Sequence, residues 1–105
     1  MKKKNPITIE GNTLTVKLEE RLDTTNAMKL IEQLDKYKEE EDITTIVFDA
    51  TELVYIASTG IRAVLYADQM VGTDPKILFI GATTEVKGVF EATGIADFIE
   101  FRDTL

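Results

Sequence analysis

The sequence contains no cysteine and no histidine. Without cysteine the chain has no disulfide, no thiolate nucleophile and no thiolate ligand for a metal. Without histidine it has no imidazole base, so the Ser-His and Cys-His relays of many hydrolases are excluded as well. Because these absences remove most hydrolase chemistry, we expect a protein that is not an enzyme and that holds no cofactor and no metal.

Other common sequence features are also missing. Neither the Gly-x-x-x-x-Gly-Lys phosphate loop nor the Gly-x-Gly-x-x-Gly dinucleotide fingerprint occurs. No apolar run approaches the roughly 20 residues that a membrane-spanning helix needs, and the N-terminus lacks the apolar core of a signal peptide. The sequence therefore predicts a cytoplasmic protein.

Basic residues are in the minority, 12 against 19 acidic ones, which gives a net charge of −7. Such a balance repels nucleic-acid backbones and anionic lipid, so neither nucleic acid nor membrane is expected as a partner. The basic cluster Lys2-Lys3-Lys4 is interpreted as part of a frayed, solvated tail over residues 1–5.

What the chain does contain suits one globular domain. Its 105 residues are 44% apolar and 30% charged, which is ordinary for a folded protein and unlike a disordered one. This length allows one hydrophobic core but not two. We therefore expect a single domain over residues 1–105.

The first half of the chain changes its periodicity once. Apolar residues alternate with polar ones on both sides of Gly11-Asn12, which predicts a hairpin. After Asp23-Thr24-Thr25, which can cap a helix, the spacing becomes three to four residues and predicts an amphipathic helix. The apolar positions of the hairpin are Ile7, Ile9, Leu14, Val16 and Leu18, and those of the helix are Ala27, Leu30, Ile31, Leu34 and Tyr37.

The second half alternates buried strands with helices. Two continuous apolar runs, at 46–48 and 77–80, are typical of central strands, and helices are expected over 59–70 and from Thr83-Thr84-Glu85 to Gly94. The first of these helices is expected to stop at Gly72 and Pro75, and the second to bury Val86, Val89, Phe90 and Ala92. With a short strand over 98–101, the order predicts an α/β fold with a mixed central sheet of four to five strands packed by helices.

The segment from Asp49 to Arg62 connects the first buried strand to the following helix. Ser58 stands at the start of that helix, where it could serve as an N-cap, a position at which serine is favoured by about 1 kcal/mol. The same position suits a phosphate, because helix N-termini offer free N–H groups and a partial positive charge. Both interpretations remain open from the residues alone.

This segment resembles the signature of the STAS domains of bacterial anti-sigma factor antagonists. In that family an Asp ends a strand, and after a loop the sequence Asp-Ser-Ser/Thr-Gly-Leu/Ile opens a helix. Here the matching residues are Asp49 and then Ala57-Ser58-Thr59-Gly60-Ile61. The resemblance extends to the opening hairpin, to the helix after Thr24-Thr25, and to Gly94 with Phe98, so it covers essentially the whole chain.

The resemblance implies a function and a set of partners. In such proteins the serine that matches Ser58 is phosphorylated by an anti-sigma factor that is also a serine kinase with a histidine-kinase-like ATPase fold, and a PP2C-type, metal-dependent phosphatase removes the phosphate. Unphosphorylated, the antagonist binds that kinase and frees the sigma factor; phosphorylated, it dissociates. The implied role is regulation of transcription through protein contacts.

Single residues of the segment receive separate interpretations. Ala57 departs from the family, which commonly has Asp or Ser there, and Thr59 is the alternative phosphate acceptor. Asp49 is expected to accept backbone N–H groups in its turn, while Tyr55 and Ile56 alternate between surface and core. The expected partner-binding residues are Asp49, Tyr55, Ala57, Ser58, Thr59, Gly60 and Arg62.

Two rival functions agree with part of the sequence. A receiver domain phosphorylated on Asp49 would need further carboxylates after the first strand to bind Mg²⁺, and Glu10 alone does not supply them. A STAS module that binds partners without ever being phosphorylated is the main alternative.

Overall fold

The computed structural model describes residues 6–37, 43–70 and 76–104. Five strands form one sheet in the order β1-β2-β4-β6-β7, in which β1 is antiparallel to β2 and the other neighbours are parallel. The strands are β1 (Ile7–Glu10), β2 (Thr13–Lys17), β4 (Thr45–Asp49), β6 (Lys76–Ile80) and β7 (Glu100–Arg102). The predicted mixed α/β sheet is confirmed.

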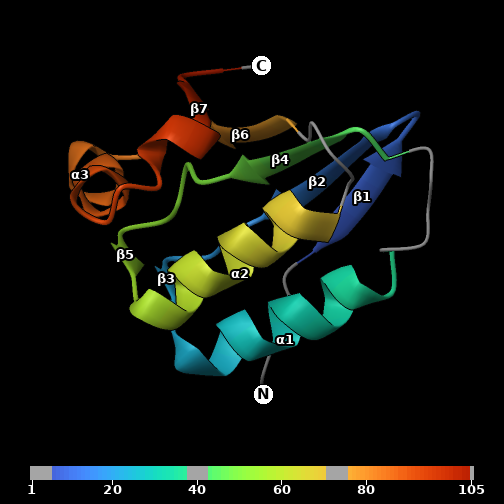
Figure 1. Ribbon diagram of the computed structural model, residues 1–105, viewed down its shortest axis with the longest axis horizontal. Coiled ribbons are helices and arrows are strands. Elements are labelled where there is room, and N and C mark those ends of the chain that lie inside the picture. Colours follow the sequence, from blue (N-terminus) through green and yellow to red (C-terminus); the bar gives the residue numbers. More distant parts are fainter. Residues whose placement is uncertain (1–5, 38–42, 71–75, 105) are drawn as a thin grey trace.

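The helices are α1 (Thr24–Asp35), α2 (Ser58–Met70) and α3 (Thr84–Ala92). As Figure 1 shows, α1 and α2 lie side by side over one face of the sheet, and α3 lies beyond the start of α2, near β5. Within the described ranges no helix is long and apolar enough to cross a membrane.

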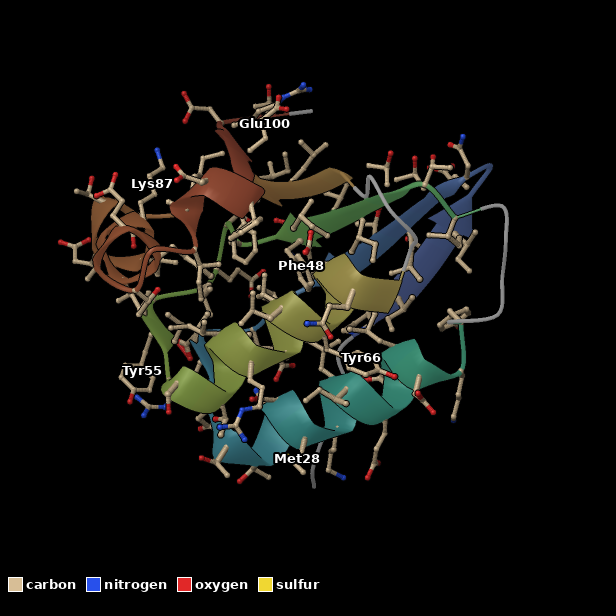
Figure 2. The ribbon with its side chains drawn as sticks, in the orientation of Figure 1. Met28, Phe48, Tyr55, Tyr66, Lys87 and Glu100 are labelled. Carbon is tan, nitrogen blue, oxygen red and sulfur yellow. The ribbon has the colours of Figure 1, made fainter. Side chains whose placement is uncertain are left out.

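The core lies between the sheet and the helices. Strand residues alternate, so Phe48 and Phe79 point toward the helices while Val47, Leu78 and Ile80 form a separate buried cluster on the other face. The Phe79 ring lies 5.1 Å from the rings of both Phe48 and Phe90. Figure 2 shows Phe48 between the sheet and α2.

The two remaining strands, β3 (Arg21–Leu22) and β5 (Tyr55–Ile56), form a separate parallel pair. Arg21 pairs with Tyr55 and Leu22 with Ile56. Because α1 begins two residues after β3 and α2 begins two residues after β5, this short pair brings the N-termini of both helices to the same end of the molecule (Figure 1).

Several sequence expectations need correction. β3 and β5 were not expected. The closing strand starts at Glu100, because Ala96–Phe98 form a 3-10 helix in which Phe98 is 58% exposed. Ala92 is exposed rather than packed in the core. The expected tail at 1–5 and the stop residues Gly72 and Pro75 lie outside the described residues.

Candidate functional site

Ser58 is the first residue of α2, and its position is fixed by the residues just before it. The N–H of Ala57 donates to the Leu22 carbonyl oxygen at 2.9 Å, which continues the β3–β5 pairing by one residue. The chain then turns into the helix, where Ser58 is exposed and Gly60 is buried. The acceptor predicted from the sequence therefore lies on the surface, at the mouth of α2.

The N-cap of α2 is Ala57 and not Ser58. The Ala57 carbonyl accepts the first intrahelical hydrogen bond, from Ile61 N–H at 3.1 Å. An alanine cannot cap with its side chain. The interpretation of Ser58 as a helix cap is thus wrong by one position, and the serine hydroxyl is not needed to start the helix.

The other two α-helices, α1 and α3, are capped in the usual way. Asp23 accepts from the N–H groups of Thr25 and Asn26 at the start of α1, and the Asn26 side chain accepts from Asp23 N–H at 2.8 Å. Thr83 accepts from Val86 N–H at 3.1 Å at the start of α3. At α2, by contrast, no side chain of the described residues occupies the N–H groups of the first turn.

The neighbouring hydroxyl, Thr59, is placed differently from Ser58. Its Oγ1 donates to Oγ1 of Thr24 on α1 at 3.4 Å, and its side chain is half-buried. For the Ser58 hydroxyl, no hydrogen bond is formed within the described part of the chain. The structure thus distinguishes an exposed serine from a threonine turned toward the adjacent helix.

Gly60 has a steric rather than a contacting role. A Cβ at this position would stand 2.7 Å from the Leu22 carbonyl oxygen and 2.8 Å from Cγ1 of Ile56. Only glycine lets α2 start this close to the β3–β5 pair. Because Gly60 is buried, it allows the close packing under Ser58 and does not itself contact a partner.

Tyr55 and Arg62 are both exposed, three residues before and four residues after Ser58. Tyr55 is 44% exposed while Ile56 is buried, which confirms the expected alternation. The Arg21 guanidinium lies 4.4 Å from the centroid of the Tyr55 ring, within the range of a cation–π contact. Arg62 is exposed and stands four residues after Ser58, on the same side of α2.

Asp49 lies away from this group. Its neighbour Phe48 points to the helices, so the Asp49 side chain lies on the opposite face of the sheet. There its Oδ1 accepts from the N–H and the hydroxyl of Thr51, at 3.1 and 2.8 Å. This geometry agrees with the turn role expected from the sequence.

The electrostatics of Asp49 follow from these contacts. Partial burial would raise the pKa of its carboxyl, but the two hydrogen bonds from Thr51 and the Lys17 ammonium outweigh burial and leave the pKa below its usual value. Lys17 contacts Glu52 as well, at 3.1 Å, and the two carboxylates raise the pKa of the lysine. Among the described residues no group of three metal-ligating side chains occurs.

Three residues of the site were not indicated by the sequence: Arg21, Leu22 and Thr24. All three belong to or follow β3, which pairs with β5 across a long stretch of sequence. A two-residue strand is too short to show periodicity, so no local pattern marks it. The only signal in the sequence is an arginine followed by a leucine, at Arg21-Leu22.

Comparisons with known proteins agree with this fold. The model of the STAS domain family matches residues 5–105. A search of curated proteins finds no match. Among solved structures, SpoIIAA, an anti-sigma factor antagonist, in its unphosphorylated form is similar with a TM-score of 0.75 and 17% identity, over 92% of this chain and 86% of that one.

Two further structures are comparable. The phosphorylated form of SpoIIAA, a Bacillus cell fate determinant, gives a TM-score of 0.74 at 15% identity, over 92% of this chain and 89% of that one. An anti-sigma factor antagonist from Mycobacterium paratuberculosis gives a TM-score of 0.80 at 13% identity, over 96% of this chain and 86% of that one. At such identities the structures show a shared fold, and the family model matches nearly every residue. The chain belongs to the STAS domain family.

Proposed function

We propose that this chain is an anti-sigma factor antagonist of the bacterial cytoplasm, switched by phosphorylation of Ser58. Unphosphorylated, it binds an anti-sigma factor that is a serine kinase with a histidine-kinase-like ATPase fold. Phosphorylated, it is released, and a PP2C-type phosphatase resets it. The observation that carries the proposal is an exposed Ser58 hydroxyl at the mouth of a helix without a side-chain cap.

The absence of a side-chain cap at the N-terminus of α2 favours Ser58 as the site of a phosphate. Because Ala57 has no side-chain acceptor, the first-turn N–H groups of α2 are left for the phosphate oxygens. An anion at a helix N-terminus gains about 0.3–1 kcal/mol, and up to about 2 kcal/mol in partly buried geometries. The departure of Ala57 from the family pattern is therefore compatible with phosphorylation, since an Asp there would compete for the same N–H groups and repel the phosphate.

The phosphoryl transfer needs nothing from this chain but the hydroxyl. The Ser58 Oγ attacks the γ-phosphorus of ATP held by the kinase, the bond to the bridging oxygen breaks, ADP leaves, and the hydroxyl proton passes to a base of the kinase. The phosphatase returns the hydroxyl by hydrolysis. The chain is in this scheme a substrate and a binding partner.

Release follows from the added charge. A phosphoserine carries about −1.5 to −2 charges at neutral pH, and this charge would enter a surface that also presents the exposed Tyr55 and Arg62. Burying an unpaired charge in an interface costs several kcal/mol. A kinase surface that binds the neutral serine closely would therefore lose affinity for the product.

The test is phosphorylation of the purified chain. We expect incubation with ATP and a serine kinase of the stated fold from the same genome to add one phosphate, which peptide mass spectrometry locates on Ser58. The Ser58→Ala variant should take up none, and Thr59→Ala should behave as the wild type. Binding without any phosphate would favour the passive module, and a phosphate retained by Ser58→Ala would assign the acceptor elsewhere, with Thr59 first to be examined.

A further inference from the structure

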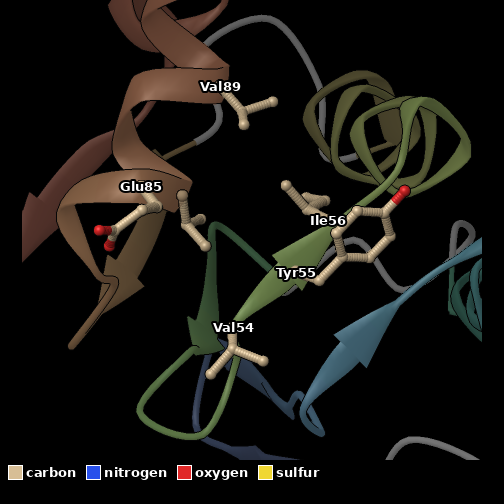
Figure 3. Close-up of a pocket in the computed structure, with 6 residues that line it drawn as sticks. Val54, Tyr55, Ile56, Glu85 and Val89 are labelled. Atoms are coloured by element: carbon tan, nitrogen blue, oxygen red, sulfur yellow. The ribbon is translucent and has the colours of Figure 1, made fainter.

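A groove lies between β5 and α3 (Figure 3). Its volume is about 150 Å³. The walls are apolar except for one carboxylate at the rim. We call it the β5–α3 groove; it is lined by Val54, Tyr55, Ile56, Glu85, Val86 and Val89.

The size of the β5–α3 groove limits what can occupy it. Sites for small molecules and cofactors usually span roughly 300–1,000 Å³, so this groove is too small for them. A cavity of about 150 Å³ with apolar walls accommodates a single ring or branched aliphatic group. The groove therefore suits one side chain of a protein partner.

The rim of the groove is unusually apolar for a surface. Val54 is 61% exposed and Tyr55 44% exposed, and these consecutive residues both line the groove. Figure 3 shows Val54 and Val89 at opposite ends of the groove, with Ile56 on the α2 side. Adjacent exposed apolar side chains beside a hollow mark a contact surface.

The groove lies within reach of any protein that acts on Ser58. From Tyr55 to Ser58 the extended chain covers three residues, about 10 Å. A standard interface buries about 800 Å² on each partner, equivalent to a disc of roughly 16 Å radius. A kinase interface of this size that is centred on Ser58 also covers the β5–α3 groove.

The negative charge beside the groove indicates which kind of partner side chain lies next to it. The exposed Glu85 carboxylate forms no ion pair within the described residues, and the whole chain carries a net charge of −7. The nearby cation Arg21 is already engaged, over the Tyr55 ring and 3.7 Å from the Asp23 carboxylate. The side of the groove formed by α3 therefore favours a partner with a basic group.

We propose that the β5–α3 groove is the anchoring site of the kinase, which inserts one aliphatic or aromatic side chain there and places a basic residue beside Glu85. The inference rests on the proposed function, since it names the kinase as partner. It adds that recognition depends on residues outside the Ser58 motif, on β5 and α3. Binding at this groove orients the kinase, and the chemistry occurs at Ser58.

The experiment compares two groove variants with a charge-matched control. Val54→Asp puts a carboxylate at the apolar rim, Glu85→Lys reverses the rim charge, and Thr8→Asp adds the same charge as the first on β1, at the far edge of the sheet. All three side chains are exposed, so melting temperatures should stay within about 4 °C of the wild type. Calorimetry gives the Kd for the kinase, and initial rates give kcat and KM for Ser58 phosphorylation.

We expect Val54→Asp to raise Kd and KM roughly tenfold or more, as loss of an interface contact does. Its kcat should stay within about twofold of the wild-type value, because Ser58 itself is unchanged. Glu85→Lys should raise Kd and weaken its salt dependence, and Thr8→Asp should match the wild type. If the wild type is phosphorylated on Ser58 but both groove variants bind as it does, the groove inference is wrong and the proposed function stands. If the wild type neither binds nor accepts phosphate, both fail.

Discussion

Gly60 lies so close to Leu22 that a β-carbon on the glycine would stand 2.7 Å from the leucine carbonyl oxygen. That oxygen also accepts the N–H of Ala57 at 2.9 Å. The carbonyl is therefore held in place by the pairing that leads into α2 and has little freedom to retreat. The spacing between β3 and the first turn of α2 depends on the absence of a side chain at position 60.

We expect Gly60→Ala to lower the free energy of unfolding by about 1–3 kcal/mol, the usual cost of overpacking a tight contact. Urea denaturation measures the change. Gly88→Ala is the matched control, because Gly88 lies inside α3 and no atom stands within 4 Å of the added carbon. This control should gain about 0.5–1 kcal/mol from helix propensity. Equal gains for both variants would contradict the steric role of Gly60.

The uncapped start of α2 predicts that Ala57→Asp stabilises the protein. A carboxylate at the N-cap can accept the free first-turn N–H groups, which is worth about 1 kcal/mol and corresponds to roughly 4–8 °C in the melting temperature of a domain of this size. Differential scanning calorimetry gives the shift. The same variant should slow phosphorylation of Ser58, and an unchanged melting temperature would mean that the N–H groups are not free.

The lowered pKa of Asp49 makes the free energy of unfolding depend on pH. Its pKa is lower in the folded protein than in the unfolded chain, so the unfolded chain binds more protons in the interval between the two values. The stabilisation is complete above the unfolded pKa of about 3.9 and is lost as the pH falls through the folded pKa.

We therefore expect Asp49→Asn to be less stable than the wild type at neutral pH, by no more than about 1 kcal/mol after solvent screening. The difference should shrink as the pH falls below the unfolded pKa. Urea unfolding at a series of pH values checks this expectation. A difference that stays constant with pH would mean that the charge of Asp49 has no part in it.

The switch itself predicts different affinities for two variants of Ser58. Ser58→Asp places a negative charge at the acceptor and should weaken binding to the kinase roughly tenfold or more. Ser58→Ala should bind the kinase at least as well as the wild type does. It should also stay bound in the presence of ATP, because it has no hydroxyl to phosphorylate. Isothermal titration calorimetry measures both, with Thr8→Asp as a control for net charge. Equal affinities for the two Ser58 variants would rule out release by charge.

Much of the fold could be predicted because the long elements have clear periodicity. The hairpin around Gly11, the buried strands at 46–48 and 77–80 and the three helices all lie where the apolar spacing placed them. The mixed sheet followed from alternating strands and helices. Even the turn role of Asp49 could be inferred, because the residue type and its place after a strand determine it.

The parts that could not be predicted depend on short or distant contacts. β3 and β5 have two residues each and are held by pairing with one another. Propensity favours serine at a helix N-cap and so predicts Ser58 there. The N-cap is Ala57 instead, because the hydrogen bond from the Ala57 N–H to the Leu22 carbonyl oxygen decides where the helix begins. The β5–α3 groove combines residues from two elements far apart in sequence, and no local motif marks it.

The pairing of β3 with β5 determines when the proposed phosphorylation of Ser58 can take place. The contact between Thr24 and Thr59 beside it joins residues 35 positions apart, and closing such a loop is stable only once the core behind it has formed. A short peptide spanning 55–62 has the same amino-acid sequence as this segment. It lacks the uncapped N-terminus of α2 and the β5–α3 groove, because both require the folded domain. The proposed acceptor site is thus created by folding, so a kinase that recognises it would distinguish a folded domain from an unfolded or newly made chain.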